Sequence, residues 1–297
     1  MSTSVTLQFP ASTANLGPGF DSLGLALNLY LTLEITRSSD WKIECRSPLL
    51  SSLPTDETNL IYQVATLTAE RYNAVLPPLH IVIDSEIPLA RGLGSSAAAI
   101  AAGIEVANYF AQLELTLEEK LLIGNEIEGH PDNIGACIFG GLVAGVSIGE
   151  VVEVVQLPKP NIDIVVTIPP YEVKTEVARK VLPEQLTREE AVLGSAVANV
   201  LIAALLTENY ELAGKMMEKD RFHEPHRLPL IPELTEARNL GKEAGAIATV
   251  ISGAGPTILT FAPKGTGEYI ASLFQRRFSH CTVKQLQIHC NNLEYNY

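Results

Sequence analysis

The stretch PLARGLGSSAAAI, residues Pro88–Ile100, decides how the rest of the sequence is interpreted. Gly92 and Gly94 flank a leucine, and two serines then lead into a run of alanines. Glycines let a backbone approach an anion closely, and a helix N-terminus presents free N–H groups and a positive dipole end. The stretch therefore predicts a phosphate-binding loop, although a glycine turn into a buried helix has the same local pattern.

Two common nucleotide-binding motifs do not fit this sequence. A Walker loop ends in Gly-Lys followed by Ser or Thr, whereas Met216 and Glu243 follow the two Gly-Lys pairs of this chain. Gly92–Ala97 matches the dinucleotide pattern GxGxxA, but that motif starts directly after a strand, and here residues 88–91 intervene. A loop without a lysine needs another positive charge, and Mg²⁺ held by a carboxylate would supply it.

The composition limits the classes of ligand. The chain has 297 residues, 46% of them hydrophobic, and a formal net charge of −13. Such an acidic chain lacks the basic surface that nucleic acids and anionic membranes require. The N-terminus has no signal-peptide pattern, and the most apolar run, Ala191–Leu206, is interrupted by Gly194, Ser195 and Asn199 and is too short to span a membrane. We therefore expect a cytoplasmic protein with no nucleic-acid or membrane partner.

Periodicity and turn residues predict an α+β chain rather than a doubly wound α/β chain. Capping boxes at Thr116 and Thr187 open two helices, the second of them long and apolar. The other expected helices are Asn59–Tyr72, Ser95–Leu113, Glu208–Lys219 and Gly267–Phe278. The expected strands are Val5–Pro10, Leu25–Thr36, Trp41–Cys45, Leu79–Ile87, Phe139–Ser147, Val151–Val155, Ile162–Ile168, Ala246–Ile251, Ile258–Ala262 and Thr282–Ile288. The break PKPN divides the chain into domains 1–157 and 158–297.

Two further segments are rich in glycine and small polar residues. PASTANLGPGFDSLG, residues 10–24, connects the first two predicted strands, and SGAGPT, residues 252–257, connects two apolar strands near the C-terminus. Either segment alone is an ordinary turn. Together with the loop at 88–100 they form three motifs in a fixed order.

These motifs, in this order and spacing, resemble the superfamily of galactokinase, homoserine kinase, mevalonate kinase and phosphomevalonate kinase, over nearly the whole chain from Phe9 to Ala262. Four stretches are similar to homoserine kinases in particular: PASTANLGPGFDSLGLAL at 10–27, EGHPDN at 128–133, TEVAR followed by LP at 175–183, and DRFHEPHR at 220–227. The resemblance implies a two-domain small-molecule kinase fold. An N-terminal mixed α/β domain would carry the phosphate loop, a C-terminal domain would be ferredoxin-like, and the active site would lie between them.

The resemblance implies ATP-dependent phosphorylation of the side-chain hydroxyl of L-homoserine, in threonine biosynthesis. ATP would bind to Pro88, Leu89, Ala90, Arg91, Gly92, Leu93, Gly94, Ser95, Ser96, Ala97 and Ala98. Mg²⁺ would be held by Ser96 and by either Glu126 or Glu128, which diverge by about 200° on a helix. Alignment with longer family members favours Glu126. A homodimer, common in the family, is compatible with the sequence, although no sequence feature specifies one.

The same resemblance assigns the amino-acid substrate. Asp21 would bind its ammonium group, and Arg179 and Arg227 its carboxylate, because a guanidinium binds carboxylates bidentately. The expected substrate-binding residues are Asn15, Asp21, His130, Asn133, Thr175, Arg179, Arg227, Ser252 and Gly253.

The expected catalytic residues are Asn133, Arg179 and Asp132. Phosphoryl transfer depends on positioning and charge neutralisation more than on a strong base. We therefore expect Asn133 to orient the attacking hydroxyl, with Asp132 as the competing candidate for a general base. The alternatives are another kinase of the superfamily, acting on a sugar or a mevalonate-pathway compound, and a non-catalytic ligand sensor on the same scaffold.

Overall fold

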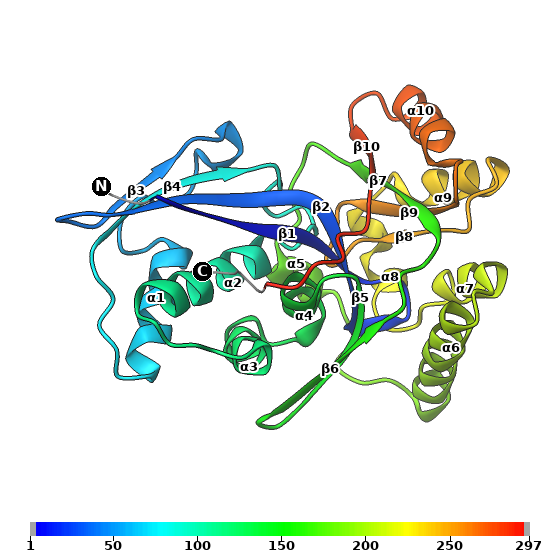
Figure 1. The fold of residues 1–297 in the computed structure, drawn as a ribbon. Helices are drawn as coiled ribbons and strands as arrows, with labels where there is room; N and C mark the ends of the chain where they lie inside the picture. Colours follow the sequence, from blue (N-terminus) through cyan, green and yellow to red (C-terminus); the bar gives the residue numbers. More distant parts are fainter. Residues whose placement is uncertain (1–3, 294–297) are drawn as a thin grey trace.

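The computed structural model describes residues 4–293, which form two β-sheets with helices packed against them (Figure 1). The first sheet has the strand order β3-β4-β2-β5-β6, with β1 paired to β2. Its strands are β1 (Val5–Asn15), β2 (Gly19–Arg37), β3 (Lys42–Cys45), β4 (Leu79–Ser85), β5 (Leu142–Ile148) and β6 (Val151–Leu157). In this domain α2 and α4 pack on β1 and β2, and α1 and α3 pack against these two helices. The helices are α1 (Leu60–Arg71), α2 (Ser95–Phe110), α3 (Leu117–Glu128) and α4 (Pro131–Phe139), with a short 3₁₀ turn at Pro48–Leu50.

The second sheet is antiparallel, with the order β10-β7-β9-β8. Its strands are β7 (Ile162–Ile168), β8 (Ala248–Ile251), β9 (Ile258–Pro263) and β10 (Thr282–Leu286). Its helices are α5 (Thr175–Lys180), α6 (Arg188–Leu206), α7 (Tyr210–Met217), α8 (Glu224–Arg227), α9 (Leu234–Glu243) and α10 (Gly267–Arg277), with a 3₁₀ turn at Leu228–Leu230. This strand order, with helices between β7 and β8 and between β9 and β10, is that of a ferredoxin-like domain. The α+β prediction is confirmed.

Most predicted elements are present, with shifts that have local causes. The first strand continues past Pro10 to Asn15: Pro10 still lies opposite Tyr30 of β2, and a register shift directly after it lets the pairing resume at Ala11. The strand expected from Phe139 starts only at Leu142, since helix α4 includes Phe139 and ends at Gly140, whose φ is +70°. Helices α4, α5, α8 and α9 are not among the predicted helices. Pro131 at the start of α4 and Asp132 in its first turn are the local signals for that helix.

The chain after β10 returns to the first sheet (Figure 1). Asn28 N–H donates to Gln287 O at 3.0 Å, and His289 N–H donates to Ala26 O at 3.0 Å. The largest hydrophobic core cluster contains residues of both sheets as well as Leu293 from this tail. The boundary at 157/158, which falls between β6 and β7, stays a prediction.

Helix α6 corrects one expectation. It is the one helix among residues 4–293 that is long and apolar enough to cross a membrane, and 28% of its most apolar window is buried. The prediction that this run is too short is wrong, because the Thr187 capping box starts the helix at Arg188 and the helix continues through Gly194 and Asn199. Length and composition alone are weak support for a membrane span, since helices of soluble proteins meet the same criteria.

One glycine fixes how α4 lies on the sheet. A β-carbon on Gly24 of β2 would lie 2.0 Å from the backbone oxygen of Asp132. Glycine is therefore the residue that lets the first turn of α4 rest directly on β2. That contact holds Asp132 and Asn133 at the edge of the cavity described below.

Candidate functional site

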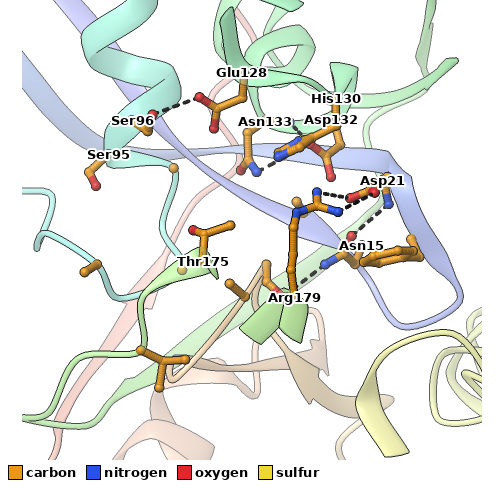
Figure 2. Close-up of a pocket in the computed structure, with 18 of the residues that line it drawn as sticks. Asn15, Asp21, Ser95, Ser96, Glu128, His130, Asp132, Asn133, Thr175 and Arg179 are labelled. Atoms are coloured by element: carbon orange, nitrogen blue, oxygen red, sulfur yellow. Dashed lines mark hydrogen bonds and ion pairs between the residues drawn. The ribbon is translucent and has the colours of Figure 1, made fainter. Parts of the chain in front are cut away.

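A cavity is lined by residues of both domains, and most of the predicted site residues face it (Figure 2). The predicted residues that line it are Asn15, Asp21, Ala90, Gly92, Gly94, Ser95, Ser96, Glu128, His130, Asp132, Asn133, Thr175, Arg179, Arg227 and Gly253. Ala14, Phe20, Val173 and Ala254 line it without having been predicted. Thr175 and Arg179 both reach the cavity from α5, as their spacing of four residues predicts.

The phosphate loop ends in a helix with free backbone donors. Gly94, at φ +69°, is the N-cap of α2 and has no side chain to bond the first N–H groups of that helix. These N–H groups and the positive end of the helix dipole suit an anion. Leu93, Ala97 and Ala98 are buried in the core, so their side chains anchor the loop rather than face a ligand.

The three glycine-bearing motifs meet at this loop. A β-carbon on Gly92 would lie 2.2 Å from Ser252 O, and one on Gly94 would lie 2.0 Å from the Ser12 hydroxyl oxygen. The Ser252 hydroxyl donates to Gly92 O at 2.6 Å, and Ser12 N–H donates to Leu93 O at 3.2 Å. Segments far apart in the sequence therefore close around the loop, and no larger residue fits at either glycine.

Two residues predicted to bind ligands hold the loop instead. The Ser252 hydroxyl is fully buried against Gly92 O and the Thr13 hydroxyl, so it does not line the cavity. The Arg91 guanidinium donates to the carbonyls of Leu89, Pro169 and Pro170 and lies 3.2 Å from the Glu172 carboxylate. Its charge is thus directed at the C-terminal domain rather than at the loop's cavity.

The structure corrects the preference between the two candidate metal ligands. Glu126 is half-exposed and forms an ion pair with Arg71, so it faces away from the loop. Glu128 lines the cavity and accepts a hydrogen bond from the Ser96 hydroxyl at 2.8 Å (Figure 2). It forms no ion pair within residues 4–293, and burial raises the pKa of its carboxyl, partly offset by that hydrogen bond. A half-buried carboxylate beside a hydroxyl offers the hard oxygen ligands that Mg²⁺ prefers.

The first turn of α4 presents a linked group of polar side chains. Asp132 Oδ1 lies 2.5 Å from His130 Nδ1 and accepts the Asn133 N–H at 2.6 Å. Burial of the His130 ring opposes its charge, but the Asp132 hydrogen bond and neighbouring carboxylates outweigh burial and raise the pKa of His130. The Ser12 hydroxyl donates to Asn133 Oδ1 at 2.9 Å, and Asn133 Nδ2 makes a long hydrogen bond of 3.4 Å to Asp132 Oδ1, so both ends of the amide are held at the cavity wall and one Nδ2 hydrogen is left for a ligand. Ser12 was not singled out, although it lies within the predicted motif at 10–24.

Two arginines and one aspartate form the charged end of the cavity. The Arg179 guanidinium donates two hydrogen bonds to the Asp21 carboxylate, at 2.9 and 3.1 Å (Figure 2). Arg227 is buried, and its pKa is lowered to about 10, first by burial and then by the charge of Arg179. The Phe20 ring stacks against both guanidinium groups, with ring centroids 5.7 Å from Arg179 and 5.4 Å from Arg227. The side chain of Asn15 bonds Asp21 N–H and Gly253 O, and so supports this end of the cavity.

His223 holds Arg227 in place. Its Nε2 lies 2.9 Å from Gly17 O, and its Nδ1 lies 3.2 Å from Arg227 Nη1. Both bonds form only when Nε2 carries the proton and Nδ1 accepts, so the ring is neutral in the folded protein. Asp220 in turn accepts the backbone N–H groups of Phe222, His223 and Glu224. The DRFHEPHR segment thus holds Arg227 in position.

A second, mainly apolar cavity lies beside the phosphate loop and shares Ser95 and Ser96 with the first. It is lined by Leu31, Leu50, Leu53, Pro54, Thr58, Asn59, Leu60, Ile61, Ile83, Ser85, Ile87, Leu89 and Ala99. Of the predicted loop residues, Leu89 faces this cavity. Its other walls come from β2, β4 and α2, and from the segment that runs from the 3₁₀ turn to the start of α1, which belongs to none of the predicted binding motifs.

Comparisons with known proteins agree with this geometry. Residues 59–141 match the model of the GHMP kinases N terminal domain, and residues 201–280 match that of the GHMP kinases C terminal domain. A curated homoserine kinase from Bacillus pumilus is 48% identical over 283 residues, covering 95% of this chain and 91% of the relative. The chain belongs to the homoserine kinase family of GHMP kinases. The solved homoserine kinase from Cytophaga hutchinsonii is 28% identical with a TM-score of 0.87, covering 98% of this chain and 96% of that one.

More distant family members share the fold. Mevalonate kinase from L. major is 15% identical with a TM-score of 0.73, covering 99% of this chain and all of the other, so the likeness extends to the arrangement of both domains. The predicted two-domain small-molecule kinase fold is confirmed.

The neutral state of His223 predicts a pH-dependent stability. Burial lowers the pKa of His223 to about 4, so between pH 6.5 and 4 the unfolded chain takes up a proton that the folded chain does not. The free energy of unfolding should therefore fall as pH falls, by up to about 1.4 kcal/mol per pH unit from this group. His223→Gln, which keeps a donor and an acceptor but does not titrate, should reduce this slope by about one proton.

Urea unfolding followed by circular dichroism at several pH values measures the slope. His226→Gln is the matched control, since its half-buried ring forms no hydrogen bond to Arg227 within residues 4–293, and its slope is the baseline against which His223→Gln is compared. An unchanged slope in His223→Gln would show that the ring is protonated in the folded protein.

Proposed function

We propose that this chain transfers the γ-phosphate of ATP to the side-chain hydroxyl of L-homoserine, giving O-phospho-L-homoserine in threonine biosynthesis. The observation that carries the proposal is a single cavity whose two ends suit different chemical groups: one end suits phosphates and a metal ion, and the other suits the two charges of an amino acid. The phosphate loop and Glu128 lie at one end, and Asp21, Arg179 and Arg227 lie at the other. A small substrate with an ammonium, a carboxylate and a hydroxyl matches the second end and reaches toward the first.

The ATP site is proposed on the loop and the neighbouring apolar cavity. The phosphates would accept the free N–H groups at the start of α2 and the hydroxyls of Ser95 and Ser96. The apolar cavity shares these two serines and suits a planar base, because most of its lining is aliphatic. Of the predicted ATP-binding residues, Arg91 and Pro88 would not contact ATP themselves. Arg91 would hold the loop in place, and Pro88 would shape the turn that follows β4.

The homoserine side is proposed from the charged end. Asp21 would take the ammonium, and Arg179 and Arg227 the carboxylate. Asn133 would donate from Nδ2 to the hydroxyl oxygen, with its amide held by Ser12. The Gly253 carbonyl, already accepting from Asn15 and Arg227, lines the same end and would limit the length of the substrate. Held this way, the hydroxyl needs positioning rather than a strong base.

We propose Mg²⁺ as the metal, held by Glu128 and Ser96. When bound, the ion would supply the positive charge against the phosphates that a Walker lysine supplies elsewhere. Burial raises the pKa of the Glu128 carboxyl, which means that its charged form is disfavoured there. A bound cation would stabilise that charged form, because Glu128 has no ionic partner among residues 4–293.

The cellular setting is also a proposal. We infer a cytoplasmic enzyme whose ligands are small molecules, without nucleic-acid or membrane partners, in keeping with the net charge of −13. Exposed apolar side chains on α6, among them Val192 and Leu206, suit contact with a second protein chain and are compatible with a homodimer.

A coupled ADP-release assay with a substrate panel tests the proposed function. L-homoserine should be phosphorylated with the highest kcat/KM, ahead of mevalonate, galactose and shikimate, because only homoserine pairs with both Asp21 and the two arginines. Turnover of mevalonate alone would contradict the assignment. Ligand binding without any turnover would indicate a sensor on this scaffold.

Glu128→Gln tests the metal site. Loss of the carboxylate should lower kcat by at least about 10²-fold and raise the Mg²⁺ concentration needed for half-maximal rate. Glu126→Gln is the control, because a surface ion pair with Arg71 contributes little, and it should stay within about threefold of wild type. The metal assignment would be wrong if Glu126→Gln had the larger effect.

Asp132→Asn separates a general base from a positioning group. We expect kcat to stay within about tenfold of wild type, because Asp132 Oδ1 is already engaged by His130 and by the Asn133 N–H. Asn133→Ala should cost more, about 10²-fold, through loss of hydroxyl orientation. Single-turnover kinetics at saturating ATP measure the step directly, and a loss of 10³-fold or more in Asp132→Asn would identify a base.

A further inference from the structure

The two residues proposed to bind opposite ends of the substrate are bound to each other in the structure. Arg179 Nη2 lies 2.9 Å from Asp21 Oδ1, and Nη1 lies 3.1 Å from Oδ2, which is a bidentate ion pair (Figure 2). Both side chains are partly open to the cavity, with exposed fractions of 34% for Asp21 and 40% for Arg179. A ligand that uses either charge must first take it from its partner.

The two partners differ in how firmly they are held. Asp21 is fixed by its backbone, which has a φ of +52° and donates its N–H to Asn15 Oδ1 at 3.0 Å. Arg179 extends as a long side chain from α5, a helix of six residues, and its guanidinium also lies over the face of Phe20. The guanidinium is therefore the partner that can move when a ligand enters.

Neighbouring charges make either partner unfavourable alone. Arg227 stacks on the same Phe20 ring, so an Arg179 released from Asp21 would face a like charge. Asp21, His130 and Asp132 form a group whose carboxylate oxygens and ring nitrogen lie within 4.8 Å of one another, so an unpaired Asp21 would lie near the Asp132 carboxylate, while the nearby His130 Nδ1 is already bonded to Asp132 at 2.5 Å. The ion pair relieves both repulsions at once.

We propose that the Asp21–Arg179 ion pair determines specificity for zwitterions. A ligand with only a carboxylate breaks the Asp21–Arg179 pair, forms one new pair with Arg179, and leaves Asp21 without its partner. A ligand with only an ammonium forms one new pair with Asp21 and leaves Arg179 without its partner. A zwitterion replaces one internal pair with two new pairs and leaves neither charge alone. This inference rests on the proposed function, since it takes the α-amino acid end of homoserine as the group that enters between Asp21 and Arg179.

Ligands with a single charge test the proposal. Removal of the ammonium from homoserine gives 4-hydroxybutanoate, and removal of the carboxylate gives 3-aminopropan-1-ol. Dissociation constants for both, and for L-homoserine, are measured by NMR titration of the wild-type protein, Asp21→Asn and Arg179→Gln. Because a partly exposed ion pair is weak, the expected gains are small but measurable.

In Asp21→Asn, Arg179 is released and 4-hydroxybutanoate should bind about two- to fivefold more tightly than to wild type. In Arg179→Gln, Asp21 is released and 3-aminopropan-1-ol should gain by a similar factor. L-homoserine should bind more weakly to both variants. Glu34→Gln is the matched control, since Glu34 forms an exposed bidentate pair with Arg46 at the other end of β2, and it should change none of these constants.

The proposal is overturned if Asp21→Asn binds 4-hydroxybutanoate, and Arg179→Gln binds 3-aminopropan-1-ol, no better than wild type does. That result is expected if Asp21 and Arg179 bind their ligand groups independently of each other. Thermal unfolding of each variant identifies any that fails to fold, and the two reciprocal variants test the same pair separately. A wild-type protein that neither binds nor phosphorylates L-homoserine would overturn the proposed function instead. Gains with the single-charge ligands would still establish the competition between Asp21 and Arg179.

Discussion

The site depends on the absence of side chains at two positions of one loop. At Gly92 and Gly94 a β-carbon would lie 2.2 and 2.0 Å from Ser252 O and the Ser12 hydroxyl, far inside van der Waals contact. Both glycines also have positive φ, +73° and +69°, which L side chains rarely adopt. These contacts join three segments that are far apart in the sequence. The positions of the loop, of the N-terminus of α2 and of the substrate end of the cavity therefore depend on one another.

Elements encoded by neighbouring residues were predicted well. The capping boxes at Thr116 and Thr187 start their helices where expected, and β7 has the predicted bounds, Ile162–Ile168. Most of the site residues that the family motifs assigned also line the cavity. Such features depend on hydrogen bonds within a few residues, or on motifs whose spacing the sequence displays, so they can be recognised without knowing the tertiary structure.

The errors concern the direction of side chains, which depends on partners distant in sequence. Glu126 was preferred over Glu128, but Arg71, 55 residues away, binds Glu126. Arg91 was placed on the nucleotide, although the carbonyls of Pro169 and Pro170 bind its guanidinium. Ser12 was overlooked because its role requires Asn133, 121 residues later in the chain. No local pattern contains this information.

Charge explains why the site needs both domains. An acidic chain repels an anionic nucleotide at long range, so the attraction must be local. The N-terminal sheet and its helices supply backbone donors and Glu128, while Arg179 and Arg227 come from the second half of the chain. Buried Arg227 is held there because its Nε donates to Ala178 O and its Nη1 bonds Gly253 O and neutral His223. Neither half alone would bring donors, arginines and carboxylates to one small cavity, so the junction between the two sheets is where this chemistry can occur.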